Sequence, residues 1–175
     1  RETTSENQRE RLNNLYRFQR HFYDLTRRFF LFGRDELLRE MRVLPGESVL
    51  EVGCGTGRNL LRLARLEPNA KLYGLDAADE MLKTAGAKLN ARDVQRRIVL
   101  RQGLAEEFSY QETFRLSEPF DKIFISYSLS MFPSWQKALR NAIRNLKAGG
   151  GLFIIDFWDG QGLPKWFNRL RTWWL

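Results

Sequence analysis

Cysteine and histidine are nearly absent from this sequence, which contains one of each, Cys54 and His21, among 175 residues. A single cysteine excludes a disulfide within the chain and a cluster of thiolates around a metal. A single histidine disfavours a Ser/His/Asp triad or a histidine-rich metal site, so we expect no metal. No run of about 18 apolar residues occurs, and we therefore predict no membrane-spanning helix.

Basic residues outnumber acidic residues in this sequence. Lysine and arginine number 29 against 21 acidic residues, which gives a net charge of +8 and a sequence pI near 10.0. Such a chain is attracted to anionic partners, and nucleic acid, an anionic membrane surface and an acidic small molecule all stay open. The polar start, residues 1–11, is not typical of a secretory signal, so we expect a cytoplasmic protein.

Short β-prone runs alternate with helical patterns along the chain. The expected strands are 48–52, 71–75, 98–101, 120–127 and 152–157, and the expected helices are 7–31, 35–41, 58–66, 79–89 and 133–146. This alternation predicts an α/β fold, a doubly wound and mostly parallel sheet with helices on both faces. We divide the chain into an N-terminal helical cap (1–45), a core (46–160) and an amphipathic aromatic and basic segment (161–175). In such a core, ligands bind at the carboxyl ends of the strands.

The most specific motif is a glycine-rich loop, VLEVGCGTGRN, at positions 49–59. Gly53, Gly55 and Gly57 let the backbone turn sharply and approach a ligand that any Cβ would repel. In a dinucleotide-binding loop the third glycine comes three positions after the second. Here it comes two positions after the second, and an acid, Glu51, stands two positions before the first. The loop is therefore a cofactor loop of a different kind.

An acid at the end of the next expected strand completes the pattern. Asp76 follows the last glycine by roughly 20 positions, where a carboxylate can accept both ribose hydroxyls of an adenosine. The loop, Asp76, the Gly103-Leu104-Ala105-Glu106 turn and the run 146–151 resemble the successive motifs of class I S-adenosylmethionine-dependent methyltransferases. The resemblance covers roughly residues 48–156 and implies a Rossmann-like fold with S-adenosyl-L-methionine as the cofactor.

The resemblance also implies which residues hold the cofactor. They are Glu51, Gly53, Cys54, Gly55, Gly57, Asp76, Ala77, Met81, Gly103, Leu104, Ala105 and Ser126. Glu51 is expected near the methionine amino group and Asp76 at the ribose, with Ala77 and Met81 beside the adenine. Many family members carry an aspartate where Leu104 stands, so only backbone and apolar contact with the adenine is expected there. The family usually ends in two further strands, so we expect C-terminal strands to be missing from this chain and the natural protein to be longer.

The substrate class is narrowed by the residues after the fourth expected strand. Enzymes that methylate base amines carry an Asn/Asp-Pro-Pro-aromatic motif there, and this chain has Ser126-Tyr127-Ser128-Leu129. Metal-dependent catechol enzymes need clustered carboxylates, and Asp121 lies at the wrong end of the strand. Segments 16–28, 33–34 and 126–131 are instead similar to the bacterial betaine-lipid N-methyltransferases, which trimethylate diacylglyceryl homoserine. The resemblance implies a lipid amine as substrate and peripheral contact with an anionic inner membrane surface.

Amine methylation needs an unprotonated amine held in line with the methyl group more than it needs a strong base. An aromatic face stabilises the growing ammonium charge, so Tyr23 and Tyr127 are the candidate catalytic residues. A pure packing role for both stays open. So do a phosphatidylethanolamine, soluble or RNA substrate, and a cofactor-binding subunit without activity. The aromatic and basic segment 161–175 predicts a helix that lies in a bilayer interface, covers the sheet or lines an acyl pocket.

Overall fold

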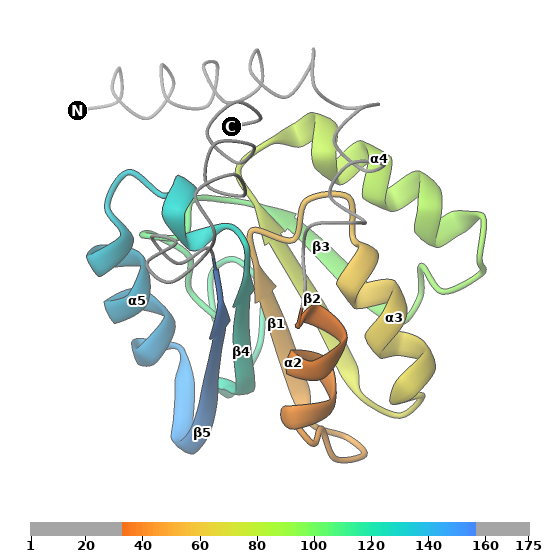
Figure 1. The fold of residues 1–175 in the computed structure, drawn as a ribbon, viewed down its shortest axis with the longest axis horizontal. Helices are drawn as coiled ribbons and strands as arrows, with labels where there is room; N and C mark the ends of the chain where they lie inside the picture. The colour runs from red at the N-terminus through yellow and green to blue at the C-terminus, as the bar shows by residue number, and fades with distance from the viewer. Residues whose placement is uncertain (1–32, 157–175) are drawn as a thin grey trace, which may run out of the picture.

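A five-stranded parallel sheet organises residues 33–156, the part of the chain that this computed structural model describes (Figure 1). The strands are β1 (Ser48–Val52), β2 (Lys71–Asp76), β3 (Ile98–Gln102), β4 (Phe120–Ser126) and β5 (Leu146–Ile155). Their order is β3-β2-β1-β4-β5, and every neighbouring pair is parallel. The order reverses between β1 and β4, which confirms the doubly wound α/β fold and locates the expected ligand edge.

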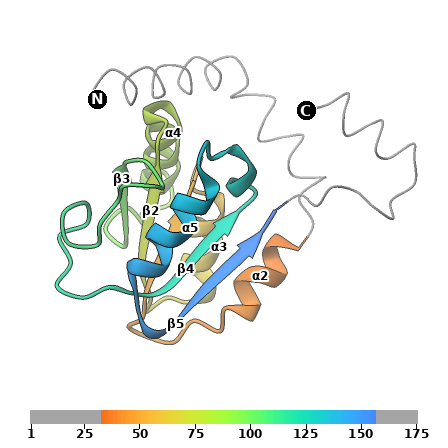
Figure 2. The same cartoon turned by 90° about the vertical axis from the view of Figure 1, so that its left-hand side faces the viewer.

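Helices cover both faces of the sheet (Figure 2). Their bounds are α2 (Arg34–Glu40), α3 (Arg58–Leu66), α4 (Asp79–Asn90) and α5 (Trp135–Arg144). One core cluster joins Leu38, Leu63 and Leu89 of α2, α3 and α4 to the sheet. The other joins Ala138 of α5 and Phe108 to the opposite face. Within the described residues, no helix is both long and apolar enough to cross a membrane.

Strand β1 is the centre of the sheet and every one of its residues is buried. A strand covered on both faces tends to be apolar along its whole length, and in SVLEV only Ser48 and Glu51 depart from that pattern. Val49 packs in the cluster under α3, whereas Leu50 and Val52 pack in the cluster under α5. Since side chains alternate along a strand, Glu51 lies on the α3 face, one residue from the end of β1.

The expected elements agree with the observed ones except near the end of the sheet. The fifth strand, expected at 152–157, begins already at Leu146, because its register against β4 shifts between Phe120 and Lys122. Gly149, with φ +79°, supplies the backbone conformation that such a bulge requires. The last helix, α5, is shorter than the expected 133–146, because Ser134 is its N-cap residue and Leu146 already belongs to β5. The expected helix 7–31 and the segment 161–175 lie outside the described residues.

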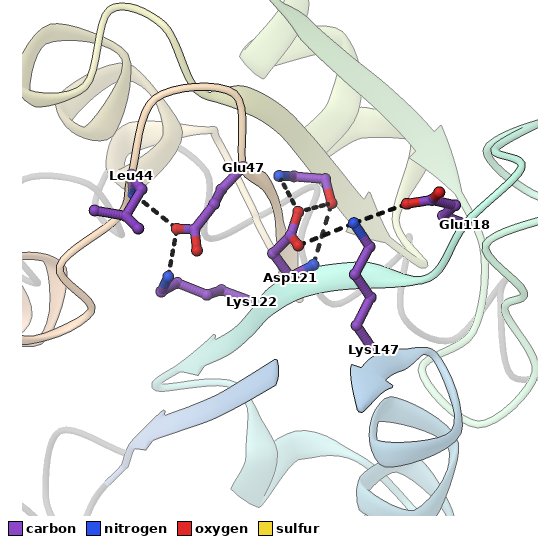
Figure 3. A network of polar contacts seen from close by, with 7 residues as sticks. Leu44, Glu47, Glu118, Asp121, Lys122 and Lys147 are labelled. Carbon is purple, nitrogen blue, oxygen red and sulfur yellow. Dashed lines mark hydrogen bonds and ion pairs between the residues drawn. The ribbon is translucent and has the colours of Figure 1, made fainter. Parts of the chain in front are cut away.

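A polar network joins the amino ends of β1, β4 and β5 (Figure 3). Asp121 accepts hydrogen bonds from the backbone N–H and the hydroxyl of Ser48, both at 2.8 Å, and pairs with Lys147 at 3.0 Å. Lys122 pairs with Glu47 in the same region. Asp121 therefore lies at the edge of the sheet opposite to the glycine loop, as its sequence position indicated, and fastens three strands together.

Replacing Asp121 with asparagine should lower the free energy of unfolding by about 1 kcal/mol at neutral pH, since a partly exposed charged hydrogen bond is lost. Burial raises the pKa of Asp121, but the hydrogen bonds from Ser48 and the Lys147 ammonium outweigh it and leave the pKa below its ordinary value. The carboxylate therefore contributes stability above its unfolded pKa of about 4, and this contribution is lost as the pH falls through the folded pKa. Urea unfolding of Asp121→Asn and wild type across this range measures the effect, and a difference that does not shrink in acid would contradict it.

Candidate functional site

A cavity opens at the carboxyl ends of β1, β2 and β4, beside the point where the strand order reverses. It is lined by Val52, Gly53, Gly55, Leu75, Asp76, Ala77, Met81, Gly103, Leu104, Ala105, Glu106, Tyr127, Ser128, Met131, Phe132 and Pro133. The glycine loop and the ends of three strands thus meet around one space. This is the position at which open α/β sheets bind their ligands.

The glycine loop takes a course that side chains would prevent. Gly53 has φ +75°, and a Cβ there would lie 2.4 Å from the hydroxyl oxygen of Ser128. Gly55, with φ +52°, has no atom within 4 Å of the place of its Cβ, so its backbone faces open space in the cavity. The loop is anchored to β2, because the backbone N–H groups of Gly53 and Cys54 donate to the carbonyl of Leu75 at 2.8 and 2.9 Å. The backbone of the glycine loop therefore lines the cavity without side chains over it, and the hydrogen bonds to β2 hold it in place.

Asp76 ties the end of β2 to the same loop. Its carboxylate accepts hydrogen bonds from the backbone N–H groups of Gly55, at 2.7 Å, and Ala78, at 2.9 Å. Burial raises the pKa of Asp76 above its ordinary value, and these two hydrogen bonds oppose the rise. A carboxylate has about four acceptor positions, so this one keeps positions for further donors from the cavity.

Glu51 lies behind the loop with 1% of its surface exposed. Asn59, near the start of α3, donates to Glu51 Oε1 at 2.7 Å, whereas Oε2 has no hydrogen-bond partner among the described residues. Burial raises the pKa of Glu51 to about 8; the Asn59 hydrogen bond and Arg34 lower it, and Asp76 raises it. The carboxyl group is therefore protonated at neutral pH, and a cation beside Oε2 would convert it to a carboxylate.

The wall that follows β3 is mostly apolar. Leu104 and Ala105 are buried, and Met81 of α4 lines the same cavity. Asn141 of α5 donates to the Ala105 carbonyl at 3.1 Å and so fixes this wall. Glu106 also lines the cavity and accepts a long hydrogen bond, 3.4 Å, from the backbone of Ser134. The wall suits a flat apolar group, as the leucine at position 104 indicated.

The segment that follows β4 forms the remaining wall. Tyr127 is 7% exposed and has φ +55°, a conformation that is rare for a residue with a bulky side chain. Its backbone N–H donates to the Ile155 carbonyl of β5 at 2.7 Å. The Ser128 hydroxyl donates to the Val52 carbonyl of β1 at 3.1 Å. Burial raises the pKa of Tyr127 above its ordinary value, so the ring carries a neutral hydroxyl at neutral pH.

Some of the predicted site residues lie outside the cavity wall. The Cys54 side chain belongs to the core cluster under α3, and burial raises the pKa of its thiol. Gly57 lets α3 approach α4, since its Cβ would lie 3.2 Å from Ala85 Cβ. Ser126 is buried, and its hydroxyl has no hydrogen-bond partner within the part of the chain described. Tyr23 lies outside the described residues.

Sequence reasoning assigned no role to several residues that the fold brings to this edge. Among the lining residues these are Glu106, Ser128, Met131, Phe132 and Pro133. No local pattern indicates Ser128, because β4 ends at Ser126 and the left-handed backbone of Tyr127 interrupts the alternation before it. Arg34, buried at the first position of α2, also went without a role.

Comparison with known proteins identifies a matching family and several relatives. A family model described as a methyltransferase domain matches residues 44–173. The demethylmenaquinone methyltransferase of Listeria welshimeri is 31% identical over 134 residues, which are 76% of this chain and 54% of that protein. The chain thus spans about half the length of the curated relatives that it matches.

Solved structures share the fold. The YcgJ protein of Bacillus subtilis has a TM-score of 0.65 and 24% identity, over 80% of this chain and 57% of that one. A methyltransferase of Geobacter sulfurreducens, solved in complex with S-adenosyl-L-homocysteine, has a TM-score of 0.58 and 20% identity, over 70% and 46%.

Proposed function

Because the chain belongs to the class I S-adenosylmethionine-dependent methyltransferases, we propose that it methylates the amine of a lipid headgroup, that of diacylglyceryl homoserine. When bound, S-adenosylmethionine supplies a methyl group on a positively charged sulfur. The chain's own residues bind the cofactor, hold the amine in line with that methyl group and stabilise the charge that develops on it.

The cavity fits the cofactor by the chemistry of its residues. Glu51 Oε2 is a buried acceptor without a partner among the described residues, and an ammonium group is the donor that satisfies it. Asp76 keeps acceptor positions for ribose hydroxyls at the end of β2. Gly55 leaves open space above the loop, and the apolar wall at Leu104 suits the adenine. Glu51 would bind the amino group at one end of the cofactor, Asp76 the ribose in its middle, and the wall at Leu104 the adenine at its other end.

The observation that carries the amine proposal is Tyr127, a buried ring held beside the cavity in a left-handed backbone conformation. Such a conformation costs about 1–2 kcal/mol and persists where the surroundings enforce it. The aromatic face of Tyr127 would stabilise the ammonium that forms when the amine is methylated. The two carboxylates that line the cavity, Asp76 and Glu106, belong to other walls than Tyr127, because they follow β2 and β3 instead of β4.

The lipid part of the proposal is supported by two separated segments that resemble the betaine-lipid enzymes. These are 33–34 and 126–131, and both lie at the end of β5. Gly33 lies against the Ile155 side chain, since a Cβ on it would be 2.7 Å from Ile155 Cδ1. Tyr127 donates its N–H to the carbonyl of the same residue. Residues of both segments therefore meet at the end of β5, and Tyr127, Ser128 and Met131 of the second segment line the cavity.

A second candidate acceptor is demethylmenaquinone, because relatives named for that reaction are 31% identical over 134 residues. The two acceptors differ in the atom that receives the methyl group and in charge. A methyl-transfer assay that offers both acceptors therefore distinguishes the two proposals.

The test offers labelled S-adenosylmethionine to the full-length protein with diacylglyceryl homoserine, phosphatidylethanolamine or demethylmenaquinone in mixed micelles. We expect label in the homoserine lipid, and none when Asp76 is replaced by alanine. Transfer to demethylmenaquinone alone would overturn the amine proposal. Intact cofactor binding without transfer to any lipid would direct attention to soluble amines and RNA.

Tyr127→Leu should lower the rate of methyl transfer about tenfold, whereas Tyr127→Phe should stay within about threefold of wild type, because the ring face is worth roughly 1–2 kcal/mol. Both variants keep a side chain of similar size and the same left-handed backbone cost. The measurement is single-turnover transfer at saturating cofactor. Equal losses in the two variants would assign the effect to the hydroxyl instead of the ring.

A further inference from the structure

A second pocket lies at the edge of the sheet opposite to the glycine loop. Residues at the start of β2 and at the start of β3 line it. Its volume is about 280 Å³. Pockets that enclose a drug-sized molecule measure roughly 300–1,000 Å³, so this one suits a small chemical group.

The charged side chains that line this pocket are all positive. Lys71, Arg96 and Arg97 contribute three cations, and no acidic residue of the described chain lines the pocket. Tyr73 adds a hydroxyl group. Burial raises the pKa of Tyr73, so this hydroxyl stays protonated at neutral pH and is able to donate a hydrogen bond. The pocket therefore favours a group that carries negative charge and accepts hydrogen bonds.

Arg97 is held in place by the end of α3. Its Nη2 atom donates to the carbonyl of Ala64 at 3.0 Å and to that of Pro68 at 2.7 Å. The Nε and Nη1 atoms make no hydrogen bond to the described residues, so their donors are available to a ligand. A guanidinium that is already fixed loses little side-chain freedom when it binds a ligand.

The pairing of β2 with β3 brings the other donors to the same place. Tyr73 of β2 pairs with Val99 of β3, and both residues line the pocket. Since side chains alternate along a strand, Lys71 lies on the same face of the sheet as Tyr73. Lys71 and Arg96 are exposed and form no ion pair with the described residues, so their charges are uncompensated there.

We propose that this pocket binds a phosphate group, with Arg97 as the fixed donor and Lys71 and Arg96 compensating the charge. A phosphate monoester carries about −1.5 to −2 charges at pH 7 and has three strong acceptor oxygens. A carboxylate carries one charge on two oxygens, so three cations match phosphate better. The inference goes beyond the proposed function, since the pocket shares no residue with the cavity at the glycine loop. A free phosphate compound and a lipid headgroup such as that of phosphatidate share this chemistry.

The test follows the backbone amide signals of the ¹⁵N-labelled full-length protein by NMR while inorganic phosphate replaces chloride at constant ionic strength. We expect saturable shifts at residues 70–73 and 96–99, with a Kd below about 10 mM. Lys71→Met and Arg96→Met should each weaken binding about fivefold or more. Arg92→Met is the matched control, because Arg92 is an exposed arginine that does not line the pocket, and it should change the Kd less than about twofold. Acetate should bind at least about tenfold more weakly than phosphate.

Cosedimentation with phosphatidylcholine vesicles that contain phosphatidate distinguishes the two sources of phosphate. Binding to these vesicles that Arg96→Met abolishes assigns the site to a lipid headgroup, whereas binding of free phosphate alone assigns it to a soluble compound. An equal loss of affinity in Arg92→Met would show general attraction to a basic surface and overturn the site, as would equal binding of acetate or binding of RNA without binding of phosphate. S-adenosylhomocysteine binding should be unchanged in all three variants, which checks the fold. The phosphate titration needs no methyl acceptor, so failure of the lipid proposal does not affect it.

Discussion

Replacing Glu51 with glutamine should weaken S-adenosylhomocysteine binding more than about 100-fold while making the free protein more stable at alkaline pH. The binding loss follows because a neutral amide at the position of Oε2 no longer attracts the ammonium group. Asn59 can still donate to the remaining oxygen of glutamine, so the local packing is kept.

The gain in stability has a definite sign and pH range. The folded protein raises the pKa of Glu51 to about 8, mainly by burial. The unfolded chain titrates near pH 4.3, so between these values the folded state holds a proton that the unfolded state has lost. Stability therefore falls as the pH rises from about 4 to about 8, and the glutamine variant, which cannot ionise, escapes this loss. The difference should reach a few kcal/mol above about pH 8.

The measurement is urea unfolding of wild type and Glu51→Gln at about pH 4 and about pH 9, without cofactor. We expect near-equal stability in acid and a more stable variant in base. Glu118→Gln is the control, because the Glu118 side chain is 71% exposed and lies at the opposite edge of the sheet. A variant that is no more stable than wild type at alkaline pH would show that the folded protein does not raise the pKa of Glu51.

Replacing Gly53 with alanine should cost about 2–4 kcal/mol of stability and abolish cofactor binding. The new methyl group would lie 2.4 Å from the Ser128 hydroxyl oxygen, and the φ of +75° is unfavourable for any residue with a Cβ. To relieve the contact, the hydrogen bond from Ser128 to the Val52 carbonyl must break, and the two walls of the cavity must separate.

Gly86→Ala is the matched control for this substitution. Gly86 lies inside α4, and its Cβ would have no atom within 4 Å. Alanine is favoured over glycine in a helix interior, so this variant should gain about 0.5–1 kcal/mol. Thermal unfolding and calorimetry with S-adenosylhomocysteine measure both variants. Gly53→Ala within about 0.5 kcal/mol of wild type would show that the loop can adjust, contrary to the close contact.

The fold and the cofactor edge were predictable because their signals are local. A buried parallel strand such as β1 is mostly apolar, and the sharp turn that follows it needs glycine. The sequence therefore predicts both the strand and the turn. The position of Asp76 follows from the length of one strand–helix–strand unit. These constraints act over roughly 20 residues, which a single sequence reveals.

Other features depend on contacts that no local pattern contains. Ser128 contacts Gly53 and donates to Val52, which is 76 positions away in the chain, across the junction of β1 and β4. Arg34 belongs to a short helix whose charged residues are otherwise typical of a solvated surface, and only packing on the sheet buries it. The early start of β5 at Leu146 depends on a bulge opposite β4, where glycines would ordinarily indicate a loop.

The polar network around Asp121 has a consequence for how such a protein can evolve. It joins three strands at their amino ends (Figure 3), while the residues that line the cavity lie at the carboxyl ends. Changes in those loops leave the register of the sheet intact, because the register is fixed at the other edge. Mutational drift can therefore alter acceptor preference without first losing the fold, which makes this architecture permissive to new specificities.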